Sequence, residues 1–247
     1  MLTLTGDETL SVDFRRNCLL LDVDGTLLDI APTPEAVVVP PGLVESLAAL
    51  STHFHGALGF VSGRTLEMLD ALFEPLKLAT VGCHGAEWRF AGSTEVHRLR
   101  ELSEEVKKRV REIALVAPGV TLEDKGYTLA VHYRLAPEAG AAILRALLEQ
   151  RAFFASQDLM ILRGRAVLEI KPRWFNKATG MKHLMQSPPF AGRIPVFLGD
   201  DTTDEDIFRV LPDFEGVGIA VGRAIPGASR VFASPANVRR WLNELSG

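Results

Sequence analysis

The sequence predicts an α/β fold with a Rossmann-like parallel sheet, interrupted by an inserted α+β unit. Continuous apolar runs that suit buried parallel strands alternate with helical segments near both ends of the chain. The middle of the chain instead carries two helix–hairpin segments in succession. A chain of 247 residues is long enough for a medium domain that carries a second, smaller one.

The N-terminal part of the predicted core contains three apolar strands separated by two helices. The strands cover residues 18–23, 56–61 and 78–83, and the helices cover residues 41–53 and 65–73. Leu43, Leu47 and Leu50 give the first helix an apolar face at helical spacing. Because each helix joins two strands, the strands should be parallel, with crossover connections.

The predicted insert covers residues 100–172 and has the order αββαββ. Amphipathic helices are expected over residues 101–116 and 137–151. The first hairpin joins residues 119–123 to 127–135 through Asp124-Lys125-Gly126, and the second joins 159–162 to 166–171 through Arg163-Gly164-Arg165. This order predicts a small open sheet with both helices on one face.

After the insert the parallel pattern returns, so residues 1–99 and 173–247 are assigned to one core domain. Apolar strands are predicted over residues 194–198 and 216–221. Helices are predicted over residues 177–185, from the acidic stretch to residue 208, and from Ser234-Pro235 to residue 245.

Composition and charge exclude several classes of protein. Hydrophobic residues make up 47% and charged residues 23% of the chain, as in an ordinary globular protein, and the net charge of −4 argues against nucleic acid as a partner. Cys18 and Cys83 are too few for a disulfide framework and indicate free thiols in a reducing cytoplasm. The N-terminus shows no secretory signal, and no apolar run reaches the ~18 residues of a membrane span.

Two carboxylates stand at the end of the first predicted strand, in Asp22-Val23-Asp24-Gly25-Thr26. Residues two apart on a strand point to the same side, so the charges would repel unless a cation or a shared proton compensates them. Mg²⁺ prefers oxygen ligands and would do so. Gly25 permits a sharp turn, and Thr26 offers a hydroxyl and an amide to an anion. The alternative is a turn with two solvated aspartates.

Three further motifs accompany the predicted strands and helices. Ser62-Gly63-Arg64 follows the second strand and would otherwise be an ordinary turn and helix N-cap. Lys177 begins a helix, where a lysine is usually solvated. Acidic side chains crowd residues 200–206 after an apolar strand, which suits either a helix N-terminus or a hard cation. Ligands of open α/β sheets bind beyond the carboxyl ends of the strands, where most of these motifs lie.

Taken together and in this order, the motifs DVDGTLL, SGR, a lysine after the insert, and GDDTTDEDIF resemble the haloacid dehalogenase superfamily of phosphotransferases. Within it, HGAEWR at 84–89, KGYTLAVHYR at 125–134, LEIKP at 168–172 and GDDTTDEDIF resemble the trehalose-6-phosphate phosphatase family. The resemblance runs from about Cys18 to Val221. One departure is WFNKATG, where Ala178 replaces the glycine usual after the lysine and Trp174-Phe175 adds bulk, which puts the local loop shape in question.

The resemblance implies a role for each of these residues. Asp22 is the nucleophile that forms an aspartyl phosphate, and Asp24 protonates the leaving oxygen and later activates water. The metal, Mg²⁺, is held by Asp22, by the backbone carbonyl of Asp24 and by Asp200, with Asp201 and Asp204 in or near the surrounding shell. Ser62 and Lys177 hold the transferred phosphoryl oxygens.

The insert, by the same resemblance, is a cap domain that reads a small-molecule sugar phosphate and closes over the phosphoryl site. Thr128, Ala130, His132 and Arg134 share one face of a predicted strand, which could grip hydroxyls. The residues expected to bind substrate are Gly25, Thr26, Arg64, Glu123, Lys125, His132, Arg134 and Glu169. Any of the charged ones could instead be solvated or form a structural ion pair. His84 and Glu87 could be structural in their turn or could contact the sugar.

Three functions are compatible with the sequence. The resemblance implies a Mg²⁺-dependent trehalose-phosphatase, a phosphoric monoester hydrolase that acts as a monomer in the cytoplasm. The alternatives are a phosphatase or phosphomutase for another sugar phosphate, and a sugar-phosphate sensor without activity. The presence of Asp22, Asp24, Lys177 and Asp200 argues against the sensor, because a binding module needs no nucleophile.

Overall fold

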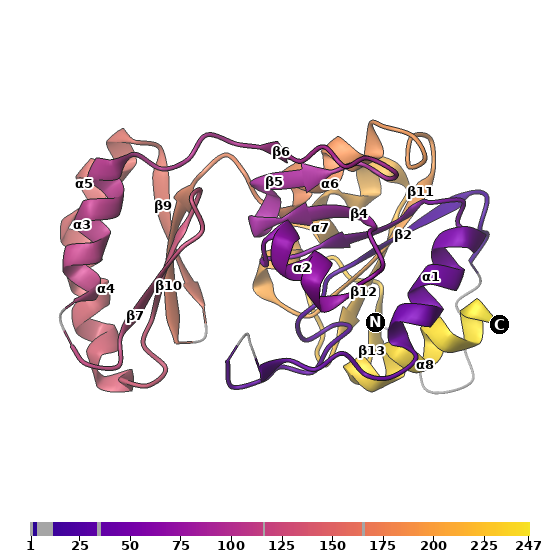
Figure 1. The fold of residues 1–247 in the computed structure, drawn as a ribbon, viewed down its shortest axis with the longest axis horizontal. Coiled ribbons are helices and arrows are strands. Elements are labelled where there is room, and N and C mark those ends of the chain that lie inside the picture. Colours follow the sequence, from indigo (N-terminus) through magenta and orange to yellow (C-terminus); the bar gives the residue numbers. More distant parts are fainter. Residues whose placement is uncertain (1, 4–11, 34–35, 116, 165) are drawn as a thin grey trace. The chain divides into compact units, whose positions relative to one another are not determined.

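The structure is a computed structural model that describes residues 2–3, 12–33, 36–115, 117–164 and 166–247. The chain divides into two compact units, Met1–Arg98 with Asn176–Gly247, and Leu99–Phe175. We call the first unit the core and the second the cap. The predicted fold class is confirmed, because the core is an α/β structure with a largely parallel sheet (Figure 1).

Among the described residues of the core, nine strands form one sheet. Their order across the sheet is β1-β13-β12-β11-β2-β3-β4-β5-β6, and only the pairs β4–β5 and β5–β6 are antiparallel. The bounds are β1 Leu2–Thr3, β2 Asn17–Leu21, β3 Leu58–Val61, β4 Ala79–Gly82, β5 Glu87–Arg89, β6 His97–Arg98, β11 Ile194–Gly199, β12 Val217–Val221 and β13 Arg230–Phe232.

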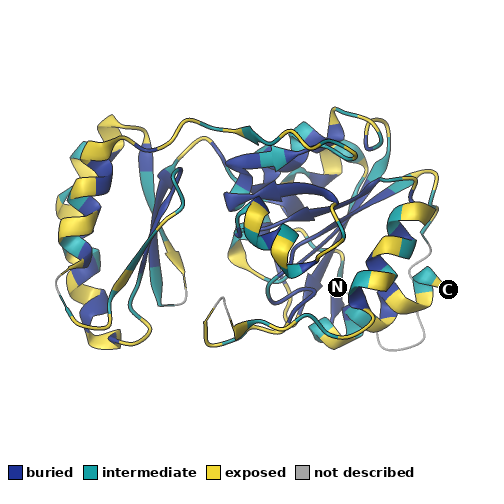
Figure 2. Ribbon diagram, in the orientation of Figure 1, coloured by how far each residue is buried: buried dark blue, intermediate teal, exposed yellow. Residues whose placement is uncertain are grey.

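The register of the central strands determines where their carboxyl ends meet. Leu21 of β2 pairs with Leu198 of β11 on one side and with Phe60 of β3 on the other. All three strands are parallel, so the residues that follow them emerge at the same edge of the sheet. The strands themselves are buried, as the dark blue ribbons of Figure 2 show.

Within the described part of the core, five α-helices cover this sheet. They are α1 Leu43–His53, α2 Leu66–Leu72, α6 Lys177–Met185, α7 Glu205–Val210 and α8 Pro235–Ser246. The helix α1 buries Leu43, Leu47 and Leu50, the apolar face expected from its spacing, and packs against α8 (Figure 1). The helices α6 and α7, which flank the site described below, also pack against each other.

The cap is an antiparallel four-stranded sheet with helices packed on one face. The strand order is β7-β8-β10-β9, with β7 Thr121–Asp124, β8 Leu129–His132, β9 Leu159–Gly164 and β10 Val167–Pro172. The helices are α3 Glu104–Ala114, α4 Gly140–Glu149 and α5 Arg151–Ser156. Val110, Ile143 and Leu147 of the helices form one apolar cluster with Val131 and Ile170 of the sheet.

The structure differs from the predicted elements in several places. The single helix predicted over residues 137–151 is a short 3₁₀ turn, Pro137–Ala139, followed by α4 and by a separate α5. The strands β1, β5, β6 and β13 were not predicted because runs of two or three residues show no periodicity. Residue 116, the last of the helix predicted over residues 101–116, Arg165 of the second predicted turn and parts of the N-terminal segment lie outside the described residues.

Among the residues that the structure describes, no helix is both long and apolar enough to cross a membrane.

Both cysteines should be unreactive in the native protein. Cys18 and Cys83 are fully buried, and burial raises the pKa of the Cys18 thiol to about 12. Since the thiolate is the reactive form, we expect neither residue to be modified by an aromatic disulfide reagent near pH 8, and both to react after denaturation. Prompt labelling of the native protein, followed by peptide mapping to Cys18, would contradict this packing.

Candidate active site

Asp22 lies immediately after β2, at the edge of the sheet where the central strands end. Its backbone N–H donates to the carbonyl of Leu198, 2.9 Å away, which extends the pairing with β11 by one residue. Asp22 is only 4% exposed. A buried carboxylate is costly unless charged or hydrogen-bonding groups compensate it, so its neighbours are informative.

Lys177 supplies a compensating charge. It is the first residue of α6, whose start is fixed by a capping box in which Asn176 and Thr179 exchange hydrogen bonds. Its ammonium is buried and lies 2.7 Å from Asp22 Oδ1 and 2.7 Å from Asp204 Oδ1. Burial alone would lower the pKa of Lys177, but the charges of Asp204 and Asp22 outweigh it and raise that pKa. The lysine expected to hold phosphoryl oxygens is therefore a charged group that contacts Asp22.

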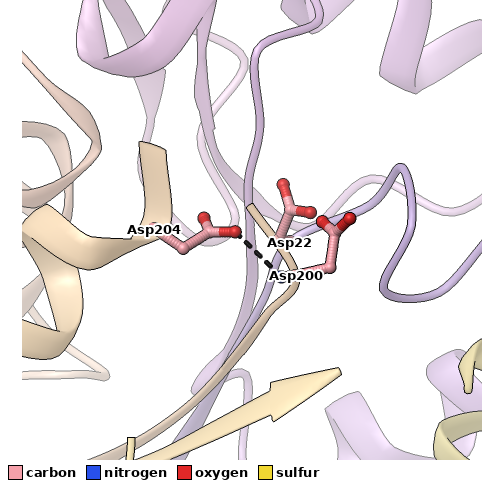
Figure 3. Close-up of side chains that lie close together, drawn as sticks. All are labelled: Asp22, Asp200 and Asp204. Atoms are coloured by element: carbon pink, nitrogen blue, oxygen red, sulfur yellow. Dashed lines mark hydrogen bonds between the residues drawn. The ribbon is translucent and has the colours of Figure 1, made fainter. Parts of the chain in front are cut away.

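Three carboxylates of the core lie close together, as Figure 3 shows. Asp22, Asp200 and Asp204 each offer an oxygen, and these oxygens lie within 4.8 Å of one another. Asp204 Oδ2 also accepts the backbone N–H groups of Asp200 and Asp201, both at 3.0 Å. Asp204 thus orients the turn that presents Asp200, and its other oxygen contacts Lys177.

The local charge of this cluster suits a cation. Burial raises the pKa of Asp22 well above its ordinary value, an effect that Lys177 opposes and that Asp204 and Asp200 reinforce. Burial, then the charge of Asp204, raises the pKa of Asp200 to about 6. Crowded carboxylates of this kind are compensated by a hard cation, and Mg²⁺ needs only one or two of them because it retains several waters.

Gly25 has a steric role next to Asp200. Its φ of 81° lies in the left-handed region, and a Cβ atom here would be 2.1 Å from Asp200 Oδ2. A side chain at position 25 would therefore displace the carboxylate as well as strain the turn. A pocket of about 360 Å³ in the core reaches this point and is lined by residues that include Gly25, Asp200 and Arg223.

Thr26 is directed to the carboxylates rather than outward. It is fully buried, and its hydroxyl donates to Asp22 Oδ2 at 3.1 Å. We expected this hydroxyl to be offered to an anion; in the structure it hydrogen-bonds Asp22 instead.

Asp24 follows Asp22 by two residues, and strand alternation was expected to point both side chains the same way. The strand β2 ends at Leu21, so both aspartates belong to the following loop, where that alternation does not apply. The Asp24 carboxylate accepts two hydrogen bonds from Arg64, from Nε and Nη2, each 2.7 Å long. Such a two-point ion pair fixes the orientation of the carboxylate.

The loop after β3 carries both Arg64 and Ser62. The Arg64 backbone N–H donates to Ser62 Oγ at 3.1 Å, so the hydroxyl proton of Ser62 remains available as a donor. Both residues are buried. Arg64 was expected to bind sugar, and the structure gives its guanidinium a contact with Asp24.

The sequence also drew attention to Asp201 and to the segment WFNKATG. Asp201 is exposed and its carboxylate lies 4.0 Å from Arg223. Ala178 is buried in the core, and the capping box beside it is intact, so the substitution leaves the start of α6 in place. In the cap, Phe175 is buried and Trp174 is 57% exposed.

The predicted substrate residues of the cap lie mostly on the face of its sheet opposite the helices. Glu123 of β7 and Glu169 of β10 both pair with Ala130 of β8, which puts them in one row on one face. His132 Nε2 lies 2.9 Å from Glu123 Oε2, and Lys125 Nζ lies 3.9 Å from Glu123 Oε1. Glu169 is buried, whereas Arg134 lies beyond β8 and is exposed.

The fold and the acidic site define a phosphatase of the haloacid dehalogenase superfamily. The trehalose-6-phosphate phosphatase C-terminal domain of C. albicans has the same fold, with a TM-score of 0.82 and 25% identity over 94% of this chain and 92% of that chain. The predicted fold and superfamily are thus confirmed.

Sequence comparison narrows the class to one family. A family model described as trehalose-phosphatase matches residues 20–234. The probable trehalose-phosphate phosphatase of Sinorhizobium fredii is 40% identical over 231 residues, which are 93% of this chain and 86% of that protein. The trehalose-6-phosphate phosphatase of Escherichia coli is 37% identical over 227 residues, which are 91% and 85% of the two chains. The chain therefore belongs to the trehalose-phosphatase family, as the motifs predicted.

Proposed function

We propose that this protein hydrolyses trehalose 6-phosphate to trehalose and phosphate, with Asp22 as nucleophile and Mg²⁺ as cofactor. The observation that carries the proposal is the buried contact of 2.7 Å between Lys177 Nζ and Asp22 Oδ1, beside Asp200, in a chain of this family. Asp22 and Asp200, with the backbone carbonyl of Asp24, would hold Mg²⁺, which supplies neutralising charge to the phosphoryl group when bound.

The residues of the core account for both half-reactions. In the first, an Asp22 carboxylate oxygen attacks phosphorus, the bond from phosphorus to the sugar oxygen breaks, and Asp24 gives its proton to that oxygen. In the second, Asp24 takes a proton from a water that attacks the same phosphorus, which releases phosphate and restores the Asp22 carboxylate. Lys177 and Ser62 stabilise charge on the phosphoryl oxygens during both steps.

The cap residues would select the sugar. We assign the glucose hydroxyls to Glu123, His132 and Glu169, because carboxylate and imidazole groups gathered on one face of a sheet suit a polyol. Lys125 and Arg134 are the cap cations assigned to the same substrate.

Phosphate release from a panel of sugar phosphates, with and without Mg²⁺, tests the proposal. We expect the highest kcat/KM on trehalose 6-phosphate and loss of activity when a chelator removes the metal. Equal kcat/KM on glucose 6-phosphate would contradict the substrate assignment. A requirement for a bisphosphate activator would indicate a mutase, and absence of hydrolysis of every ester would indicate a sensor.

Replacing Asp24 with asparagine should separate the two half-reactions. The asparagine amide cannot carry the proton, so phosphoenzyme should still form slowly but break down far more slowly, with turnover reduced by about 10²–10⁴-fold. Acid-quenched phosphoenzyme, measured with labelled substrate, should therefore accumulate in this variant above the wild-type level. A trap that stays empty under all conditions would count against the covalent route.

Mg²⁺ should stabilise the folded protein in a pH-dependent way. The folded Asp200 holds its proton up to about pH 6, against an ordinary pKa of 3.8, so its contribution to the free energy of unfolding falls as pH rises through this window. A bound cation requires the charged form of Asp200, so its binding offsets this loss in the free energy of unfolding. Excess Mg²⁺ should thus raise Tm more near pH 7 than near pH 5. Equal shifts at both pH values would argue against carboxylate ligands.

The proposal includes a monomer that acts in the cytoplasm on a small molecule, without a nucleic acid or membrane partner. Light scattering after size exclusion, at several protein concentrations, would test the monomer directly. A concentration-dependent mass near twice 27.0 kDa would contradict it.

A further inference from the structure

Glu87 is a buried carboxylate that no step of the proposed reaction uses. It begins β5 and is 4% exposed. Its Oε1 accepts the backbone N–H of Leu66, the first residue of α2, and lies 3.8 Å from the thiol of Cys83. Its Oε2 lies 3.5 Å from Arg98 Nε. Because burying a carboxylate is costly, an acid at this position needs a specific reason.

The turn that precedes Glu87 holds the loop of Ser62 and Arg64 through its backbone. The Cys83 N–H donates to the Arg64 carbonyl at 2.8 Å, and the His84 N–H donates to the Ser62 carbonyl at 3.0 Å. Both donors sit in left-handed backbone conformations, with φ of 47° and 54°. Such conformations are unusual for residues other than glycine and persist where surrounding contacts require them.

The side chains of the turn and the loop also fit closely. A Cβ atom on Gly63 would lie 2.6 Å from two ring atoms of His84, so only glycine lets the loop approach the turn this far. Glu87 adds a third anchor at the end of the loop, where it satisfies a donor of the first turn of α2 that has no partner within the helix. The loop from Ser62 to Leu66 is thus fixed at both ends and in the middle.

This loop positions Asp24, the acid–base group of the proposed reaction, and carries Ser62. Arg64 grips both oxygens of Asp24, and its N–H sets the orientation of the Ser62 hydroxyl. A displacement of this loop would therefore move Asp24 and Ser62 together, although neither touches Glu87.

We propose that Glu87 is a positioning residue for the phosphatase reaction, which fixes the Ser62–Leu66 loop and, through Arg64, the proton-transferring carboxylate of Asp24. The inference rests on the proposed function and assigns the turn at residues 83–87 to the support of the site rather than to contact with sugar. Misplacement of about 1 Å is enough to cost up to 10²-fold in rate.

The test compares Glu87→Ala with Glu87→Gln and with Asp70→Ala. Glutamine keeps an oxygen that accepts the Leu66 N–H. Asp70 is the matched control, because its carboxylate accepts two hydrogen bonds of 2.7 Å from Arg89 and so also ties α2 to β5, away from the loop. For each variant, Tm and kcat/KM would be measured on trehalose 6-phosphate and on p-nitrophenyl phosphate, whose leaving group departs without a proton.

We expect Glu87→Ala to lower kcat/KM on the sugar phosphate about 10-fold or more, and on the aryl phosphate by a smaller factor. Glu87→Gln should restore most of this loss, and Asp70→Ala should lower Tm without changing the ratio of the two kcat/KM values. If the alanine variant does not fold, Glu87→Asp, whose carboxylate is one methylene too short to reach Leu66, takes its place.

An unchanged ratio in Glu87→Ala, or an equal change in the Asp70 control, would overturn the inference and leave the proposed function intact. Wild-type protein that hydrolyses neither ester would overturn the proposed function, and with it the role given to Glu87.

Discussion

Replacing Asp22 with asparagine should lower turnover by at least about 10⁴-fold, the scale seen when a covalent nucleophile is removed. The amide cannot attack phosphorus, so no covalent intermediate forms, whereas loss of an acid or a positioning group leaves a slower reaction. The variant should remain folded. Burial raises the pKa of Asp22, and Lys177 keeps its second partner, Asp204, at 2.7 Å.

The measurement is phosphate release from trehalose 6-phosphate at saturating substrate, together with Tm. Asp213→Asn is a suitable control, because it makes the same chemical change at an exposed aspartate of the core. Activity in Asp22→Asn within a factor of about ten of wild type would rule out Asp22 as the nucleophile, because a loss of that size is what slight misplacement of reacting groups causes. A variant that fails to fold would show instead that the fold requires the Asp22 carboxylate to compensate the buried charge of Lys177.

Local signals in the sequence were sufficient to predict most of what builds the site. The run CLLLDV is apolar because β2 is buried on both faces, and this placed Asp22 at the end of a central strand. The helix at residues 177–185 was predicted with its observed bounds, and in the structure Asn176 and Thr179 cap it within four residues. Both signals arise from contacts that are near in the chain.

Partners that are distant in the chain could not be predicted. Arg64 is 40 residues from Asp24, and nothing in either motif indicates that the two side chains form a two-point ion pair. The contact of Lys177 with Asp204 depends equally on how α6 and α7 pack. The role of Glu87 depends on β5, which has three residues and no periodic signal.

The acidic character of the chain also has a structural explanation at this site. Asp22, Asp200 and Asp204 gather around a single buried lysine. One positive charge leaves the group with a negative excess, and after burial the charge of Asp204 helps to raise the pKa of Asp200 to about 6. Part of the net charge of −4 therefore belongs to a cation site and says little about the partners of the surface.

Replacing Lys177 with methionine should both abolish activity and destabilise the fold. The ammonium is buried and compensates two carboxylates, so its removal leaves buried charges without a counter-charge, at a cost of about 3–5 kcal/mol in the free energy of unfolding near pH 7. The folded variant should bind a proton on Asp22 more readily, because burial raises the pKa of this residue and the lysine that opposes the effect is missing. Its stability should therefore fall as pH rises from about 5 to 7, since the folded state then holds more protons than the unfolded state.

Urea unfolding at both pH values would measure this difference, with Lys182→Met, a change to a partly exposed lysine of the same helix, as the control. Adding Asp204→Asn to Lys177→Met removes one of the two stranded charges and should recover part of the stability at neutral pH. It should not recover activity, because the group that stabilises charge on the phosphoryl oxygens is still missing. Lys177→Met with wild-type stability near pH 7 would show that water, rather than the lysine, compensates Asp22, and the assignment of Lys177 to the centre of the site would then be wrong.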